Sequence, residues 1–264
     1  LFTASATAGT YAGTIHVSDS TTGISANTSV TVTAGPLVSL SISPASASVT
    51  VGATQQLTAT GRDSHGNTVE VTPTWSMASC ALGTIAPSGL FTAGTTAGSC
   101  PEGIRAASGA VSATAGITVQ PGPLARIRVT PPNPSLTVGA TQAFAASGED
   151  QHGNAVSIDP TWSVGTAAAG SIDAAGVFTA GTVAGGYANA IRAVDSGVTG
   201  TASITVTAGA LAAIALSPTS ATLTPNATQQ FTASGEDQYG NPVAFTPTWS
   251  VRNGGGSITA TGLF

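Results

Sequence analysis

The sequence predicts an all-β fold of tandem β-sandwich modules, because three motifs recur with one period and no long stretch keeps helical spacing. The tetrad Pro-Thr-Trp-Ser begins at positions 73, 160 and 247, so the period is 87 residues. An Ala-Thr-Gln motif begins at positions 53, 140 and 227, and a Gly-Pro/Ala-Leu motif begins at positions 35, 122 and 209. A unit of this length is one small folding domain rather than a turn of a solenoid.

The period divides the chain into four parts. Residues 35–121 and 122–208 are complete modules, and each is long enough to bury a modest core of its own. Residues 1–34 supply only the C-terminal part of a module. Residues 209–264 supply only the N-terminal part of another.

The first half of the module 122–208 predicts an edge strand and a hairpin. Residues 124–130 alternate in polarity, and prolines then interrupt the strand before it resumes at residues 136–138. Proline has no amide donor, so a strand split in this way belongs at the margin of a sheet. The segments that follow are a strand over 142–148, a Gly-Asn turn at 150–154 and a strand over 156–164.

The second half of the same module completes the sandwich. The pattern predicts strands over 177–180, 187–194 and 202–207, with a turn at Ser196-Gly197 between the last two. About seven antiparallel strands in two sheets result.

One tryptophan occurs in each Pro-Thr-Trp-Ser tetrad, at positions 75, 162 and 249. A sandwich of this kind often packs a tryptophan between its two sheets, which makes Trp75, Trp162 and Trp249 core residues. The alternative is an exposed ring on which a ligand stacks. The core role is the prediction that we carry forward.

Composition excludes several classes of partner. Charged residues make up 6 % of the chain, the formal net charge is −5 and the sequence contains no lysine. A basic stripe that could neutralise phosphates is therefore missing, and nucleic acid is not an expected partner. No apolar run reaches the roughly 18 residues of a membrane span, and no signal sequence is recognisable at the start.

The two cysteines, Cys80 and Cys100, lie in one module. Their counterparts are Ala167 for Cys80, and Tyr11 and Tyr187 for Cys100. We expect a Cys80–Cys100 disulfide, which would stabilise a loop of this size by about 3 kcal/mol in an oxidising compartment. Two free buried thiols are the alternative.

The ordered motifs resemble the bacterial immunoglobulin-like domains of the group 2 type, the Big repeats. They are a Gly-x-Leu-x-x-Ile/Leu start, Ala-Thr-Gln-Gln-Leu/Phe-Thr-Ala, Asp-x-His/Tyr-Gly-Asn, Pro-Thr-Trp-Ser, Gly-Leu-Phe-Thr-Ala-Gly and a closing Ile-Thr-Val-x-Ala/Pro-Gly. The resemblance covers essentially the whole chain and implies immunoglobulin-like sandwiches. It also implies a spacer or display role in surface adhesins, invasin-like proteins, phage virion proteins or secreted glycosidases. The family carries no catalytic residue, and the cysteine pair departs from its usual pattern.

Short connectors join the modules, such as Thr33-Ala34-Gly35-Pro36-Leu37 and Val119-Gln120-Pro121-Gly122-Pro123-Leu124. Connectors of this length, stiffened by proline, predict modules that stack end to end as a semi-rigid rod.

The two ends of the chain share one point of the repeat, because Leu1-Phe2 and Leu263-Phe264 both match Leu90-Phe91. A sandwich that lacks strands leaves bare edges and an open core. We therefore expect head-to-tail polymerisation in which terminal parts of neighbouring copies complete one sandwich, with Leu1, Phe2, Leu263 and Phe264 in the contact. A fragment cut at an arbitrary boundary is the alternative.

The search for chemistry gives no catalytic residue and no cofactor. The repeated acidic site is Asp63, Asp150 and Asp237, just before the Gly-Asn turn. Such an aspartate can accept backbone amide bonds across the turn. Calcium binding is the alternative, although calcium needs six or more oxygens and the motif supplies two or three.

Together these patterns predict a non-enzymatic, extracellular or cell-surface structural protein of bacterial type, which forms the shaft of a filament or a surface stalk. The alternative function is a binding module, either an adhesin segment for a host or glycan surface or an accessory domain of a phage or secreted protein. Exposed aromatic pairs on one sheet face would favour binding, and aromatics confined to the core would favour a spacer.

Overall fold

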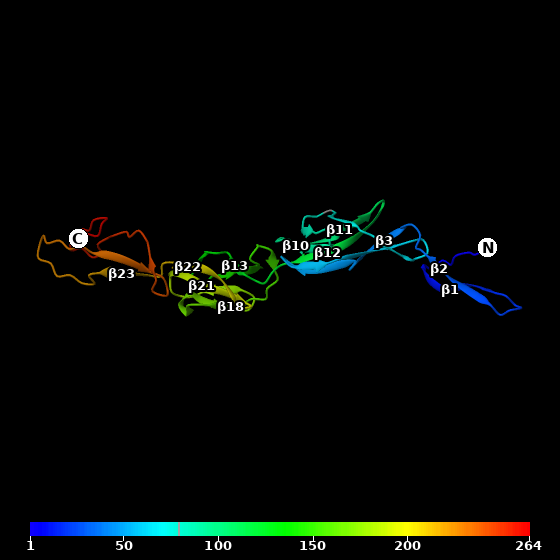
Figure 1. Ribbon diagram of the computed structural model, residues 1–264. Helices are drawn as coiled ribbons and strands as arrows, with labels where there is room; N and C mark the ends of the chain where they lie inside the picture. Colours follow the sequence, from blue (N-terminus) through cyan, green and yellow to red (C-terminus); the bar gives the residue numbers. More distant parts are fainter. Residues whose placement is uncertain (79) are drawn as a thin grey trace. The chain divides into compact units, whose positions relative to one another are not determined.

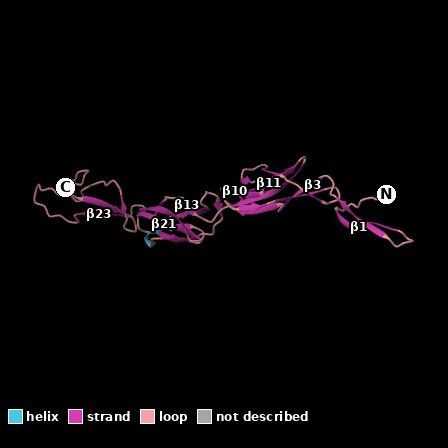
Figure 2. Ribbon diagram, in the orientation of Figure 1, coloured by secondary structure: helices cyan, strands magenta, loops and turns pink. Residues whose placement is uncertain are grey.

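The computed structural model describes residues 1–78 and 80–264 and confirms the predicted all-β fold. Strands and loops make up the described chain apart from one short 3-10 turn at Ala167–Ala169 (Figures 1 and 2). The chain forms two compact units, Leu1–Pro123 with His152–Asn154, and Leu124–Gln151 with Ala155–Phe264. No helix within the described residues has the length and apolar character needed to cross a membrane.

The module 35–121 consists of a four-stranded sheet and two three-stranded sheets. Their orders are β4-β12-β11-β8, β3-β6-β7 and β5-β10-β9. The strands are β3 (Ser39–Ser43), β4 (Ser46–Thr50), β5 (Thr54–Gln56), β6 (Thr58–Arg62), β7 (Thr68–Val69), β8 (Thr74–Met77), β9 (Gly83–Ile85), β10 (Leu90–Ala93), β11 (Gly98–Ser108) and β12 (Val111–Gln120).

The module 122–208 repeats this topology strand for strand. Its sheets are β14-β22-β21-β18, β13-β16-β17 and β15-β20-β19. The strands are β13 (Arg126–Thr130), β14 (Ser135–Thr137), β15 (Thr141–Ala143), β16 (Ala145–Glu149), β17 (Ala155–Val156), β18 (Thr161–Val164), β19 (Gly170–Ile172), β20 (Val177–Ala180), β21 (Gly185–Asp195) and β22 (Val198–Thr207).

The split edge strand lies where the prolines predict it. β13 pairs only with β16 at the margin of one sheet, and β14 lies at the margin of the four-stranded sheet. The prolines between them end the first ladder and let the chain cross to the other sheet. The pairing of β14 with β22 is parallel, as is that of β4 with β12, so the sheets are not wholly antiparallel as predicted.

The strand predicted over residues 156–164 is divided in the structure. β17 pairs with β16, whereas β18 pairs with β21 in the other sheet. Pro160 lies between the two pieces, and it cannot donate to a continuous ladder. Divisions of this kind raise the number of strands to ten in each complete module, counted over the described residues, against the seven or so predicted.

The core of each module lies between its sheets. In the module 122–208, Ile127 from β13, Phe178 from β20 and Ile204 from β22 belong to one buried cluster. Along β22, apolar side chains at alternate positions are buried while the threonines between them are exposed. This period of two places one face of the strand on the core and the other in solvent.

The three tryptophans are half-buried, and Trp75 and Trp162 lie at the side of a core. Trp75 and Trp162 pack against the buried clusters of their modules. A glycine of the Gly-Leu/Val-Phe motif lies against each ring, because a Cβ built on Gly176 would be 3.0 Å from Trp162 Cε2. Gly89 and Gly262 approach Trp75 and Trp249 in the same way. The packing of Trp75 and Trp162 against their clusters therefore requires a glycine that leaves room for the ring.

The part-modules contain fewer strands. Residues 1–34 form one hairpin of β1 (Gly9–Ser18) and β2 (Ser25–Val32), which pair antiparallel. Residues 209–264 form the sheet β23-β24-β25 and an isolated bridge between Gln230 and Leu263. Those strands are β23 (Ala213–Ser217), β24 (Thr232–Glu236) and β25 (Pro242–Val243).

Candidate functional site: the latch between consecutive modules

In each of the two units, one aspartate organises the connector that enters a module. In the first unit, Asp63 is buried at the turn after β6, and its carboxylate accepts hydrogen bonds from the amides of His65 and Asn67, both at 2.9 Å. The other carboxylate oxygen accepts from the amide of Gly35 at 2.8 Å. Gly35 lies 28 positions earlier, in the connector. The aspartate therefore ties the turn of a module to its own entry segment.

The asparagine at the end of the turn reaches into the preceding part-module. The Asn67 side chain donates to the carbonyl of Ala6 and accepts from the amide of Ala8, both at 2.9 Å. The same side-chain amide donates to Asp63 at 2.8 Å. Asn67 thus pairs with the backbone of a neighbour as an edge strand would, through one donor and one acceptor.

The second unit repeats this arrangement two periods later. Asp237 accepts from the amide of Gly209 at 2.8 Å, and Asn241 donates to its carboxylate at the same distance. Asn241 also accepts from the amide of Ala184 at 2.7 Å and donates to the carbonyl of Thr182 at 2.9 Å. We use the name latch for three parts together. They are the aspartate, the asparagine and the tripeptide whose backbone the asparagine bonds.

The middle copy of the turn places Asn154 in the same role. Its side chain accepts from the amide of Ala97 and donates to the carbonyl of Thr95, both at 2.8 Å. Asp150 is buried like its two counterparts. The latch asparagine therefore holds an equivalent tripeptide at all three positions, namely residues 6–8, 95–97 and 182–184.

The hydrogen bonds of the latch stabilise the charged form of Asp63 and of Asp237. Burial raises the pKa of Asp237, but the hydrogen bonds from the Asn241 side chain and from the amides of Gly209, Asn241 and Tyr239 outweigh it and lower the pKa to about 2. The Asn67 side chain and the Gly35 amide likewise hold the pKa of Asp63 well below its usual range.

We expect the latch of the second unit to weaken in acid. An aspartate in an unfolded chain has a pKa of about 4, so the folded state, with its lower pKa, binds fewer protons between about pH 4 and about pH 2. The stability contributed by Asp237 is complete above that window and is lost as the pH falls through it. The measurement is the urea midpoint against pH, followed through amide signals of β24. Asp237→Asn, which has no titrating group, should give a shallower dependence, and an equal slope would contradict the assignment.

Calcium is the other use that the sequence suggests for Asp63, Asp150 and Asp237. Among the described residues, no three acidic, histidine or cysteine side chains gather as a metal site. The Asp63 carboxylate already accepts four hydrogen bonds, whereas calcium takes six or more oxygens. We expect the same melting temperature in calcium and in excess chelator. A lower temperature in chelator would instead assign calcium to this turn.

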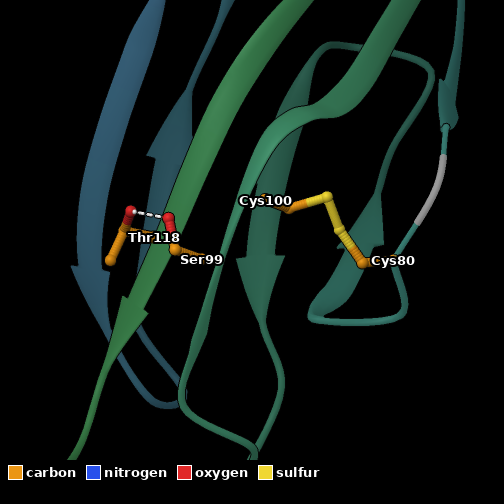
Figure 3. The surroundings of a disulfide bond; sticks show 4 residues. All are labelled: Cys80, Ser99, Cys100 and Thr118. Atoms are coloured by element: carbon orange, nitrogen blue, oxygen red, sulfur yellow. Dashed lines mark hydrogen bonds between the residues drawn. A yellow bond between two sulfur atoms is a disulfide. The ribbon is translucent and has the colours of Figure 1, made fainter.

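The predicted disulfide joins Cys80 and Cys100 (Figure 3). Cys100 is buried on β11, and Cys80 lies in the connection between β8 and β9. On the preceding position of β11, the hydroxyl of Ser99 lies 2.9 Å from that of Thr118 on β12. The bond therefore fastens a loop to the middle of the four-stranded sheet.

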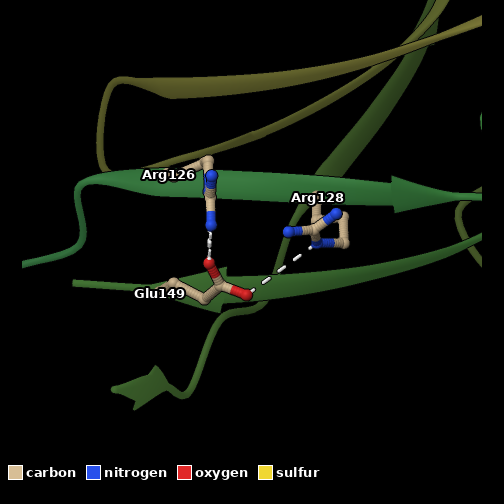
Figure 4. A network of polar contacts seen from close by, with 3 residues as sticks. All are labelled: Arg126, Arg128 and Glu149. Carbon is tan, nitrogen blue, oxygen red and sulfur yellow. Dashed lines mark hydrogen bonds and ion pairs between the residues drawn. The ribbon is translucent and has the colours of Figure 1, made fainter. Parts of the chain in front are cut away.

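A charged cluster distinguishes the module 122–208. Arg126 and Arg128 on β13 both contact Glu149 on β16 (Figure 4). The hydrogen bond and charge of Arg126 lower the pKa of Glu149. Both arginines are largely exposed, so these pairs contribute little to stability. The sequence places serine and alanine at the equivalent positions of β3 and β23, so the cluster belongs to this module.

The sequence pattern identifies the aspartates but places Asn67, Asn154 and Asn241 only in a turn. Their partners lie about 60 positions earlier, in segments with no distinctive composition. One signal in the sequence could have identified these asparagines. An asparagine recurs every 87 residues at the end of the turn, although a turn alone does not require asparagine there.

These features define an all-β protein built of immunoglobulin-like β-sandwiches. FdeC, an Escherichia coli adhesin, has a similar structure, with a TM-score of 0.50, 23 % identity and coverage of 88 % of both chains. The chain is also 32 % identical over 220 residues to ice-binding protein 1 of Shewanella frigidimarina. That match covers 81 % of this chain but only 24 % of the relative's length. No family model matches, so the predicted group 2 assignment is not confirmed.

Proposed function

We propose that this chain is a non-enzymatic segment of a bacterial surface or extracellular protein, and that its tandem modules form a load-bearing shaft. The observation that carries the proposal is the latch, which fixes a connector and the preceding backbone once in each unit. A free linker would need no such contacts. The modules would transmit force through their sheets and the latched connectors.

The comparisons support a surface role without specifying the ligand. The adhesin FdeC supports the sandwich fold, and the ice-binding relative supports an extracellular bacterial origin. A bacterial extracellular compartment also suits the Cys80–Cys100 disulfide. We assign no enzymatic activity and no cofactor to the chain.

Small-angle scattering tests the shaft. A module of this kind adds on the order of 40 Å, so we expect a maximum dimension well above 100 Å. Asn67→Ala and Asn241→Ala should each give a scattering profile typical of a more flexible chain. Each substitution removes the two backbone contacts of a latch. Asn27→Ala is the matched control, since the exposed Asn27 side chain on β2 contacts His16 on β1 and not a latch tripeptide. A compact particle, or equal profiles for all variants, would contradict the proposal.

A binding role is the second candidate, and the ice-binding relative favours a test against ice. Because the chain spans about a quarter of that relative, we propose that this segment is a spacer and does not itself bind ice. Among the described residues, Phe2 and Tyr239 are the exposed aromatics, and each belongs to a different unit. We expect no thermal hysteresis from this chain. Hysteresis at micromolar protein would assign the binding role to these modules.

We further propose that the two part-modules complement each other. Ile214 on β23 is 55 % exposed, whereas its counterpart Ile127 is 5 % exposed beneath β22. On the β1–β2 hairpin, Ile15 is 41 % exposed, whereas Ile104 and Ile191 are fully buried. The hairpin corresponds to the element that covers β13 in a complete module, so a second copy can supply it to the sheet β23-β24-β25. Leu1, Phe2, Leu263 and Phe264 would then lie at the contact.

Sedimentation tests this complementation. We expect a mass that rises with protein concentration, and an Ile214→Asp variant that stays monomeric at every concentration because a carboxylate cannot enter the buried face. Thr31→Asp, on the polar side of the hairpin, is the control and should still associate. A wild-type chain that is monomeric up to millimolar concentration would remove head-to-tail assembly and leave the shaft proposal intact.

A further inference from the structure

Two of the three tripeptides that the latch asparagines hold are each bonded by a tyrosine as well. The Tyr11 hydroxyl donates to the carbonyl of Thr7 at 2.7 Å, and the Tyr187 hydroxyl donates to that of Val183 at 2.8 Å. Thr7 lies between the two positions that Asn67 contacts, and Val183 lies between the two that Asn241 contacts. The asparagine and the tyrosine therefore hold the same tripeptide through successive backbone groups.

Cys100 occupies the tyrosine position in the remaining module. It pairs with Ile117 on β12 in the register in which Tyr187 pairs with Ile204 and Tyr11 with Val30. A bulge follows at the same place in all three strands. The sulfur of Cys100 is in a disulfide and has no hydrogen to donate to the carbonyl of Thr96, so it cannot replace the tyrosine hydroxyl.

The disulfide loop fills the space of the missing ring. A Cβ built on Gly185 would lie 3.7 Å from the Tyr187 ring, whereas a Cβ built on the equivalent Gly98 would lie 3.1 Å from the Leu82 side chain. Leu82 follows Cys80 by two residues, so the disulfide holds it close to β11. The amide of Gly94 donates to the carbonyl of Leu82 at 2.7 Å, and the amide of Gly181 donates to that of Ala169 at the same distance without a disulfide. The feature peculiar to this module is therefore the Leu82 side chain against Gly98, the residue directly after the tripeptide 95–97.

We infer that the Cys80–Cys100 disulfide is a redox-sensitive control of the latch at Asn154. In the oxidised protein the disulfide holds the loop that carries Leu82, the Leu82 side chain packs beside Gly98, and the adjoining segment 95–97 stays in place for Asn154. A dithiol reductant supplies two electrons and two protons, the S–S bond breaks, two thiols form and the reductant closes to its own disulfide. The loop from Cys80 to Leu82 is then released, and the tripeptide loses its support. The latches at Asn67 and Asn241, which use tyrosine, are insensitive to reductant.

Amide hydrogen exchange on the full chain tests this inference. The amides of Ala8, Ala97 and Ala184 each donate to a latch asparagine and report one latch apiece. Addition of dithiothreitol should speed exchange at Ala97 by roughly tenfold or more and leave Ala8 and Ala184 within about twofold. The amide of Ile117, in the core of the same module, should also change by less than about twofold. Equal acceleration at Ala97 and Ile117 would show that the bond only stabilises the module, and no change at Ala97 would equally overturn the inference.

A variant that copies the side chains of the module 122–208 gives the second test. Cys80→Ala, Leu82→Ala and Cys100→Tyr together introduce the side chains present at 167, 169 and 187. In this triple variant the exchange rate of the Ala97 amide should stay within about threefold of that in the oxidised wild type, with or without reductant.

Tyr187→Phe in the wild type removes only a hydroxyl and should speed exchange at Ala184 alone. If the triple variant folds but leaves Ala97 unprotected, tyrosine and disulfide are not equivalent supports and the inference fails.

Discussion

Phe178→Ala is expected to lower the free energy of unfolding of the module 122–208 by about 4 kcal/mol. Phe178 on β20 is fully buried. Its ring meets that of Phe144 edge to face, with centroids 6.3 Å apart and planes at 85°. The substitution removes this aromatic contact and leaves a cavity between the sheets that a small β-sandwich has little room to close. Urea unfolding followed through amide signals of β21 and β22 reports this module alone.

The matched control for this prediction is its neighbour. Val177 lies on the same strand but points outward and is 38 % exposed. Val177→Ala should therefore change the free energy of unfolding by less than about 1 kcal/mol. Similar losses for Val177→Ala and Phe178→Ala would mean that the core does not lie where the structure places it.

Gly176→Ala should cost about 3 kcal/mol, because two effects add. The backbone of Gly176 has φ +81°, a conformation that disfavours a side chain. A Cβ at this position would also lie 2.8 Å from the carbonyl oxygen of Phe144 and 3.0 Å from the Trp162 ring. The carbonyl belongs to the backbone and cannot move away cheaply. The loss should appear as a lower urea midpoint of the same module.

Two other glycines separate the two effects. Gly197 has φ +80° but open space around its Cα, so Gly197→Ala should cost about 1 kcal/mol. Gly186 has neither a left-handed backbone nor a neighbour within 4 Å of a Cβ, so Gly186→Ala should be nearly neutral. An equal cost at Gly176 and Gly197 would show that the close approach of the tryptophan ring contributes nothing.

Local rules account for much of the fold. The proline cluster after Thr130 predicts the break between β13 and β14, and the Gly-Asn turn predicts the β16–β17 hairpin. Both depend on residues near in sequence. The parallel pairing of β14 with β22 does not follow from such rules, because its partners lie about 70 residues apart and no turn connects them.

The site divides in the same way. Asp63 could be assigned to the turn because the amides of His65 and Asn67 lie within four residues of it. The partners of Asn67 are backbone groups of Ala6 and Ala8. Backbone groups carry no signal in the sequence, so the latch was not predictable even though its period was visible.

What the sequence alone determined is the repeating unit, its all-β character and the cysteine pair, because each depends on residue type and spacing. Only the tertiary structure decided the latch and the tyrosine hydrogen bond to the latch tripeptide. The hydroxyl of Tyr187 and the asparagine Asn241 meet on one tripeptide only after two modules have folded and been joined. Hydrogen bonds of this kind depend on positions in space, and contacts between modules fix those positions.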